Sequence, residues 1–194
     1  EIEGKLDFKV KPSRSIHDQT YPRFQSREGK LELLSVFPNM DFVGGIIVKG
    51  SKLSGTSTGD TPGSLKIYNN DTLFVRCLVD EILLTHTGFS ATQSTISLYL
   101  DKDSIYHPSI LVRYDDIGKR LRVIRDEDGV GLQAFSDSYH KIDFQVEAMT
   151  WKIGGRTVDL GAIVPSSRAV GIFSSQANFD KQTFDNMTGQ ALIN

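Results

Sequence analysis

The residues best suited to ligand binding lie between Ser136 and Trp151, where aromatic and polar side chains are close together in the sequence. Tyr139 and His140 are followed by Asp143 and then by Trp151, the only tryptophan of the chain. Aromatic rings suit the apolar C–H faces of sugars, and the polar groups beside them suit sugar hydroxyls. The pattern predicts a glycan-binding surface formed by Trp151, Tyr139, His140 and Asp143.

Trp151 has a second interpretation. It is in the alternation phase of Gln145 and Glu147, away from Phe144 and Val146, which would place it on a wet face. A lone tryptophan more often packs, however, and would then cover the open edge of the second layer or a C-terminal helix. We favour packing for Trp151, and the glycan surface stays a hypothesis.

Catalytic groups are not selected by the sequence. A pair of carboxylates across a cleft can hydrolyse a glycosidic bond, but 24 acidic residues offer too many pairs to choose from. Serine is plentiful, yet no Gly-x-Ser-x-Gly motif exposes one as a nucleophile. We therefore predict no catalytic residues, and an enzyme that acts on polysaccharides remains an alternative.

Metal and cofactor motifs are also missing. The four histidines, at positions 17, 86, 107 and 140, lack the paired spacing of zinc sites, and we expect them in turns or on the surface. Asp101 and Asp103 have the alternate spacing of a calcium loop without its glycine and its terminal acidic ligand. Gly129 to Gly131 lacks the later glycine and the following helix of a phosphate loop. We predict neither a metal site nor a cofactor.

Charge and hydropathy exclude two classes of partner. Lys and Arg number 22 against 24 Asp and Glu, so a net charge of −2 offers no footprint for nucleic acid or an anionic membrane. The longest apolar stretches, such as Ile46–Val48, are far shorter than the roughly 20 residues that span a bilayer. The single cysteine, Cys77, has no partner for an internal disulfide, and its phase with Val75 and Val79 predicts a buried thiol.

Strands account for most of the pattern. Apolar residues recur at every second position, and turn-forming groups separate the runs. These runs are Leu65 and Ile67; Leu73, Val75, Cys77 and Val79; Ile82 and Leu84; Ile96, Leu98 and Leu100; and Ile142, Phe144, Val146 and Ala148. Residues 110–114 and 121–123 flank Asp115–Gly118 as a β-hairpin, and Gly154–Gly155 begins a second one. Gly44 and Gly45 indicate a bulge, a bend or close passage of another backbone.

These elements predict an all-β protein, an antiparallel β-sandwich that is jelly-roll-like, with a short C-terminal helix. Asn178 or Asp180 would cap that helix, with Phe184 and Met187 on one face. A β-solenoid is the alternative, since its rungs are also strands joined by polar corners. The expected divisions are an extended N-terminal connector over 1–30, the sandwich over 31–175 and the helical tail over 176–194.

Several segments resemble β-rich portions of very long exported proteins of gut-type Gram-negative bacteria that have no assigned function. The resemblance extends from about Leu31 onward, and no catalytic residue carries over with it. It implies an internal portion of a larger secreted or cell-envelope protein, in keeping with a chain that begins at Glu1 without methionine. The segments are Phe37–Gly45, Lys49–Gly50, Asp71–Phe74, Asp101–Pro108 and Asp137–His140.

Three functions follow as hypotheses. The first is a noncatalytic β module of a larger exported protein, which scaffolds or binds a ligand such as a glycan. The second is a polysaccharide-acting enzyme that uses an acidic pair. The third is a structural spacer whose exposed edges join neighbouring domains, and it predicts apolar patches at both ends of the segment.

Overall fold

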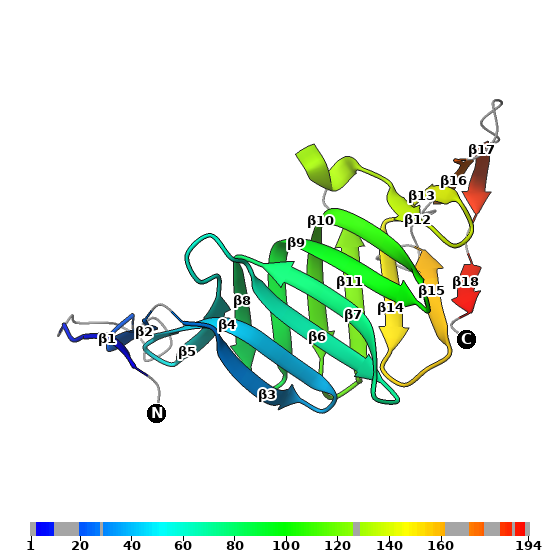
Figure 1. The fold of residues 1–194 in the computed structure, drawn as a ribbon. Helices are drawn as coiled ribbons and strands as arrows, with labels where there is room; N and C mark the ends of the chain where they lie inside the picture. The colour runs from blue at the N-terminus through cyan, green and yellow to red at the C-terminus, as the bar shows by residue number, and fades with distance from the viewer. Residues whose placement is uncertain are drawn as a thin grey trace.

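The computed structural model describes residues 3–9, 20–27, 29–125, 129–161, 171–176, 183–187 and 189–192. Within these ranges the chain forms strands and a single 3-10 turn, η2 (Gly129–Leu132) (Figure 1). The strands are β1 (Gly4–Asp7), β2 (Arg23–Ser26), β3 (Leu31–Phe37), β4 (Met40–Lys49), β5 (Lys52–Thr56), β6 (Gly63–Asn69), β7 (Thr72–Val79), β8 (Glu81–Thr85), β9 (Gly88–Leu100), β10 (Asp103–Asp115), β11 (Arg120–Arg125), β12 (Phe135–Asp137), β13 (Ile142–Gln145), β14 (Ala148–Lys152), β15 (Thr157–Gly161), β16 (Gly171–Ser175), β17 (Thr183–Met187) and β18 (Gly189–Leu192).

The strands form two layers that are continuous through the long strands β4, β9 and β10. Layer 1 contains, in order, β1, β2, the second half of β4, β5, β8, the first half of β9, the second half of β10, β11, β14, β15 and β18. Layer 2 contains β3, the first half of β4, β6, β7, the second half of β9, the first half of β10, β12, β13, β16 and β17. Every pairing is antiparallel, which confirms the predicted antiparallel sandwich and excludes the parallel coils of a solenoid.

Each long strand bends where it passes between the layers. In β4 the bend is at Gly44 and Gly45, because residues up to Gly44 pair with layer 2 and those from Gly45 pair with β5. A Cβ atom on Gly44 would lie 2.5 Å from the carbonyl oxygen of Thr56, so a side chain has no room there. Gln93 in β9 has a φ of 52°, and the register of β10 shifts after His107. The close passage predicted at Gly44–Gly45 is therefore confirmed.

The strands of both layers follow one another in chain order. The chain consequently enters at one end of the sandwich and leaves at the other, and Figure 1 shows N and C at opposite ends. At the first end, β1 and β2 project beyond the rest of the sandwich (Figure 1). Among the strands that the structure describes, the two ends are thus sheet edges without a further paired strand, and neither layer closes on itself.

The core consists of apolar rows that cross each layer from strand to strand. In layer 1, directly opposed positions make one row of Leu6, Phe24, Val48, Leu53, Leu84, Phe89, Tyr114, Leu121, Trp151 and Val158. In layer 2, the equivalent row is Leu33, Phe42, Leu65, Cys77, Ile96, His107, Phe135, Phe144 and Phe173. Alternation places these rows on the inner faces, where the hydrophobic effect holds the layers together.

Aromatic contacts join the layers in the middle of the sandwich. The ring of Phe37 in layer 2 lies edge-on to Tyr114 in layer 1, with centroids 5.3 Å apart. Phe74 in layer 2 contacts Trp151 in layer 1 at 4.3 Å. These pairs close the middle of the sandwich against water.

Two details of the prediction are confirmed and one is wrong. The hairpin around Asp115–Gly118 is β10–β11, and the hairpin around Gly154–Gly155 is β14–β15. The predicted C-terminal helix is wrong, because Phe184 and Met187 belong to β17, where Phe184 lies opposite Phe173. Pairing with β16 overrides the weak local helix preference. The predicted caps Asn178 and Asp180 lie outside the described residues.

The described part of the predicted N-terminal connector contains two strands, β1 and β2, and β2 pairs with β4. Cys77 is buried, and burial raises the pKa of its thiol to about 12, as expected of a packing residue. Among the described residues, no helix has the length and apolar character needed to cross a membrane.

Candidate functional site

Trp151 is an interior residue, not a surface one. Its side chain is 2% exposed, and its indole Nε1 donates a hydrogen bond to the carbonyl oxygen of Gly155 at 3.0 Å. The favoured interpretation, that Trp151 packs, is confirmed, and the wet-face alternative is wrong, since Trp151 lies opposite Leu121 and Val158 on the inner face of layer 1. Val146 and Glu147 lie between β13, which pairs in layer 2, and β14, which pairs in layer 1, and the phase of alternation changes where the chain passes from one layer to the other. Trp151 cannot offer its face to a sugar in this fold.

Tyr139 and His140 lie together at the β12–β13 turn. Their rings meet edge to face at 4.8 Å, and Tyr139 is 62% exposed. Asp137 holds the turn: its carboxylate accepts hydrogen bonds from the backbone amides of Tyr139 and His140 and lies 2.8 Å from His140 Nδ1. Because Asp137 is buried, these donors replace the water that its carboxylate loses. The turn is a fixed platform for the tyrosine ring.

Asp143 lies on the outer face of layer 2, in the row of Tyr106 and Ser136. The side-chain amide of Gln176 donates hydrogen bonds to Asp143, to the hydroxyl of Ser136 and to the carbonyl oxygen of Ile142. The structure thus brings Tyr139 and His140 together, places Asp143 nearby with its carboxylate already bonded, and separates Trp151 from all three.

An apolar cleft between the layers begins at this turn. Its volume is about 630 Å³, within the range of small-molecule sites. Inner-face residues of both layers line it, with polar groups at its rim: Leu100, Ile105, Ile142, Phe144, Leu160 and Phe173 inside, and Asp101, Asp137, Tyr139, His140 and Gln190 around them. The rings of Phe135, Phe144 and Phe173 stack across three strands of layer 2, so the core continues directly into the cleft.

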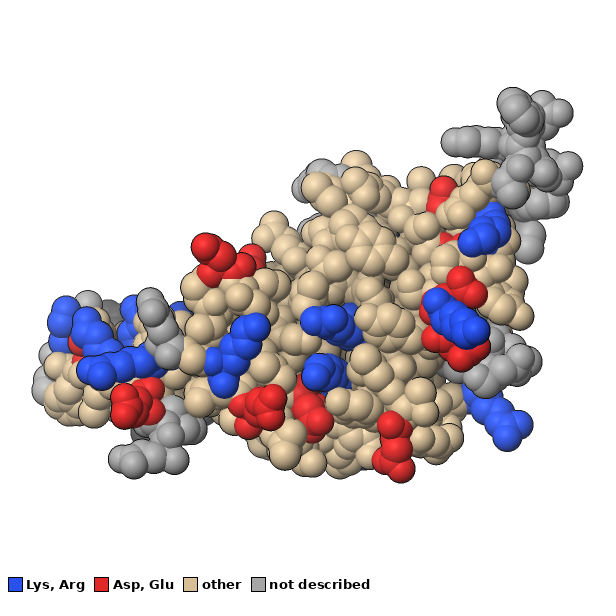
Figure 2. All heavy atoms as spheres, in the orientation of Figure 1, with Lys and Arg blue, Asp and Glu red and all other residues tan. Residues whose placement is uncertain are grey.

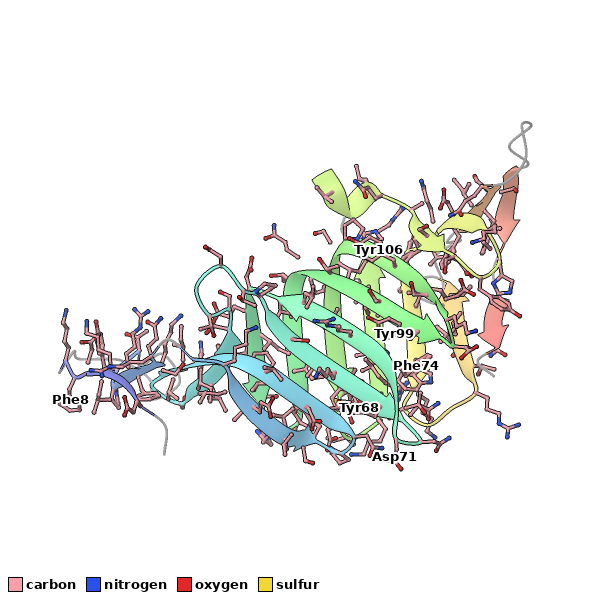
Figure 3. All side chains as sticks on the ribbon, in the orientation of Figure 1. Phe8, Tyr68, Asp71, Phe74, Tyr99 and Tyr106 are labelled. Carbon is pink, nitrogen blue, oxygen red and sulfur yellow. The ribbon has the colours of Figure 1, made fainter. Side chains whose placement is uncertain are left out.

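A polar groove of about 660 Å³ adjoins the cleft, and Asp101 lines both. Its walls come from the β6–β7 turn, the end of β9 and the β14–β15 loop, and they carry Asn69, Asn70, Tyr99 and Arg156. Figure 3 shows Tyr99 and Phe74 beside each other on this part of the molecule. Amide, carboxylate and guanidinium groups around a tyrosine are the kind of lining that sugars bind. The sequence analysis did not identify this groove, because its residues come from three distant turns.

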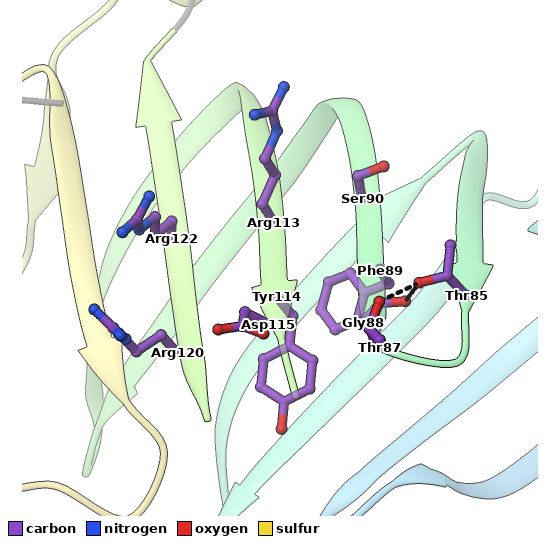
Figure 4. Close-up of a pocket in the computed structure, with 10 residues that line it drawn as sticks. All are labelled: Thr85, Thr87, Gly88, Phe89, Ser90, Arg113, Tyr114, Asp115, Arg120 and Arg122. Atoms are coloured by element: carbon purple, nitrogen blue, oxygen red, sulfur yellow. Dashed lines mark hydrogen bonds between the residues drawn. The ribbon is translucent and has the colours of Figure 1, made fainter. Parts of the chain in front are cut away.

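A third hollow, of about 500 Å³, lies on the outer face of layer 1 (Figure 4). Three arginines line it, Arg113 from β10 and Arg120 and Arg122 from β11. The hydroxyl groups of Thr85, Thr87 and Ser90 and the carboxylate of Asp115 also line it, together with Gly88, Phe89 and Tyr114. The sequence analysis did not identify this hollow, because the cross-strand register that places Arg113 opposite Arg122 is known only from the structure.

His107 corrects the expectation that the histidines lie in turns or on the surface. It is fully buried; its Nε2 lies 3.0 Å from the carbonyl oxygen of Gln133, and its Nδ1 accepts the amide of Ser109. With Nδ1 as acceptor, Nε2 carries the proton and the ring is neutral. Burial lowers the pKa of His107, with the charge of Arg125 acting in the same direction. The ring fixes the bend of β10, while His86 and His140 lie in turns and His17 is outside the described residues.

The described residues include no group of three or more His, Cys, Asp or Glu side chains that could hold a metal ion. Asp103 instead accepts a hydrogen bond from the hydroxyl of Ser138 at 2.8 Å, which links the β9–β10 and β12–β13 turns.

No family model, curated protein or solved structure matches the chain.

Proposed function

We propose that the chain is a noncatalytic β module of a larger exported protein, and that it scaffolds its neighbours by continuing their sheets. One observation carries this proposal: the strands of both layers follow chain order, so within the described part of the chain each end of the sandwich has strand edges without a paired neighbour. Such edges are templates for further strands, and natural proteins cover or pair them. A neighbouring segment on either side would complete the layers.

The first end supports the proposal most directly. The inner apolar row of layer 1 continues there beyond the core, through Phe24 and Val48 to Leu6, which is 65% exposed. Phe8 follows at 72% exposed, and Figure 3 labels it on the projecting β1–β2 region. Apolar side chains as exposed as Leu6 and Phe8 favour a partner that packs against them and covers them.

The second end has an equivalent feature. The apolar cleft opens between the last strands of the two layers, with Phe173 from β16 and Leu160 from β15 in its walls. Strands that extend both layers would also cover these side chains.

Amide hydrogen exchange tests the scaffold. In the isolated chain, we expect rapid exchange of the outward-facing amides of β3 and β17, and in the native gene product we expect protection of the same amides. Equal rapid exchange in both forms would contradict the proposal. So would a native protein whose mass equals that of these 194 residues.

A second candidate function, glycan binding, is favoured by Tyr139. Its exposed ring stands at the rim of the cleft, close to the polar groove that begins at Asp101. Calorimetry with oligosaccharides chosen from a glycan array tests it, and we expect Tyr139→Ala to abolish the heat of binding. Tyr106→Ala is the matched control, because Tyr106 is an exposed tyrosine (42%) on the outer face of layer 2. Unchanged binding in Tyr139→Ala, or no glycan bound at all, would remove this candidate.

The exported location is part of the proposal and rests on the sequence resemblance. Fractionation of the source cells tests it, and recovery of the protein from the cytoplasm would contradict it. The polysaccharide-acting enzyme stays a prediction. It needs a free acidic pair, whereas Asp137 at the cleft and Asp143 on the outer face of layer 2 are both held by hydrogen bonds.

A further inference from the structure

Two arginines of like charge lie directly opposite each other on the outer face of layer 1. Arg113 of β10 and Arg122 of β11 are partners in the strand register, and Arg120 is two residues from Arg122 on the same side of β11. Opposed side chains on antiparallel strands have Cβ atoms about 5 Å apart, so like charges there destabilise the sheet. A negatively charged group bound between the two arginines would offset this repulsion and stabilise the sheet.

Among the described residues, no acidic side chain forms an ion pair with Arg113, Arg120 or Arg122. The carboxylate of Asp115, opposite Arg120, accepts the backbone amides of Ile117 and Gly118 in the hairpin turn.

Asp116, the next acidic residue of the turn, is also engaged. It accepts a hydrogen bond from Tyr114 and pairs with Lys119 at 2.7 Å. The guanidinium groups of Arg113 and Arg122 therefore remain available to a ligand.

The hollow around the arginines is larger than a single ion requires. It holds about 500 Å³ and includes the hydroxyl groups of Ser90, Thr85 and Thr87 as well as the arginines (Figure 4). The β8–β9 turn that forms this wall is held by a hydrogen bond from the hydroxyl of Thr85 to the carbonyl oxygen of Gly88. Ser90 lies opposite Arg113 in the strand register, so a hydroxyl and two guanidinium groups are neighbours in one row.

We propose that this hollow binds an oxyanion carried by a small hydroxylated molecule, such as an acidic sugar with a carboxylate or a phosphate group. Arginine presents its donors in a planar fork that matches the oxygens of carboxylate and phosphate, so two opposed forks clamp one anionic group. The serine and threonine hydroxyls then bond to the hydroxyls of the same molecule. The site is separate from the open ends and from Tyr139, so it stands whether or not the scaffold and glycan proposals hold.

Calorimetry at low ionic strength tests the proposal, because salt screens exposed charges. The probes are glucuronate, glucose 6-phosphate, inorganic phosphate and glucose. We expect both acidic sugars to bind at least tenfold more tightly than inorganic phosphate, and glucose not to bind. We expect Arg113→Gln and Arg122→Gln each to weaken binding at least tenfold.

Arg76→Gln is the control, since Arg76 lies on the outer face of layer 2 and also stands opposite a basic residue, Lys66. Its substitution should leave binding unchanged. A melting experiment without ligand adds an independent readout: Arg122→Gln should raise the melting temperature by removing the repulsion. The proposal is overturned if neither acidic sugar binds the unmodified chain, if inorganic phosphate binds equally well, or if Arg76→Gln reduces binding as much as Arg122→Gln.

Discussion

The same apolar row of layer 1 passes through the middle of the sandwich and its first end. Its side chains are buried in the middle and exposed at the first end. In the middle, Tyr114 and Trp151 are buried because Phe37 and Phe74 of layer 2 lie against them. At the first end the row continues through Leu53 to Leu6, and both are exposed. The comparison shows that alternation decides which face of a strand is apolar, whereas an opposing layer decides whether that face becomes core.

The largest effect is expected at the layer contact in the middle. Trp151→Ala removes the ring that contacts Phe74 and leaves a cavity between the layers, and large-to-small core changes of this kind cost about 3–5 kcal/mol. We expect the free energy of unfolding, measured by urea denaturation, to fall by this amount. The control Leu53→Ala, in the same row but 38% exposed, should cost less than about 1 kcal/mol. Equal losses would show that the first end is as closed as the middle.

The bend of β4 separates the layers and should be the next most sensitive position. A Cβ atom on Gly44 would lie 2.5 Å from a backbone oxygen and 2.8 Å from the ring of Phe42, so Gly44→Ala forces the two apart. Overpacking of this kind costs about 1–3 kcal/mol. Gly161→Ala is the matched control, since a Cβ atom there meets nothing within 4 Å. Denaturation of both variants measures the difference, and a neutral Gly44→Ala would show that the bend tolerates a side chain.

A pH effect should come from the buried histidine in the bend of β10, and the matched variant is at His140 in the β12–β13 turn. The pKa of His107 is lowered in the folded chain, so below the unfolded value of about 6.5 the unfolded chain takes up a proton that the folded chain does not. Folding stability should therefore decrease as the pH falls below about 6.5. Urea denaturation from pH 7.5 to 5.5 measures this, and the slope should persist in His140→Gln and disappear in His107→Gln. If stability still decreases as the pH falls in His107→Gln, other groups cause the decrease and the prediction is contradicted.

The fold was largely predictable because strand alternation is a local property. Leu73, Val75, Cys77 and Val79 alternate on β7 as the sequence indicates, and the turn at Asp115–Gly118 fixes the β10–β11 hairpin without tertiary information. The tail was not predictable in this way. Phe184 joins the row of Phe173 through pairing with β16, and a distant strand leaves no signal in the local pattern.

The candidate site was predictable only where its residues are adjacent in sequence. Tyr139 and His140 share one turn, and the structure brings them together. Alternation alone put Trp151 on the wet face with Gln145 and Glu147, because the local pattern does not show that the chain passes from layer 2 to layer 1 between β13 and β14. The pairing of Arg113 with Arg122 depends on the observed register, in which Asp115 lies opposite Arg120. A turn centred on Asp115–Gly118 would have placed Arg113 opposite Arg120, so the sequence did not predict the observed pair.

The smallest effect on stability, and the clearest test of the open end, is expected from Leu6→Ser. Because Leu6 is mostly exposed and has no opposite layer, the free energy of unfolding should change by less than about 0.5 kcal/mol. Self-association is the sensitive readout, since an uncovered apolar row next to a free strand edge favours contact between chains. Sedimentation velocity at increasing concentration should show less association for Leu6→Ser than for the unchanged chain.

Ile117→Ser is the control, because Ile117 is 84% exposed in the β10–β11 turn, away from either end of the sheet. If Ile117→Ser reduces association equally, general surface hydrophobicity causes it and the open end does not.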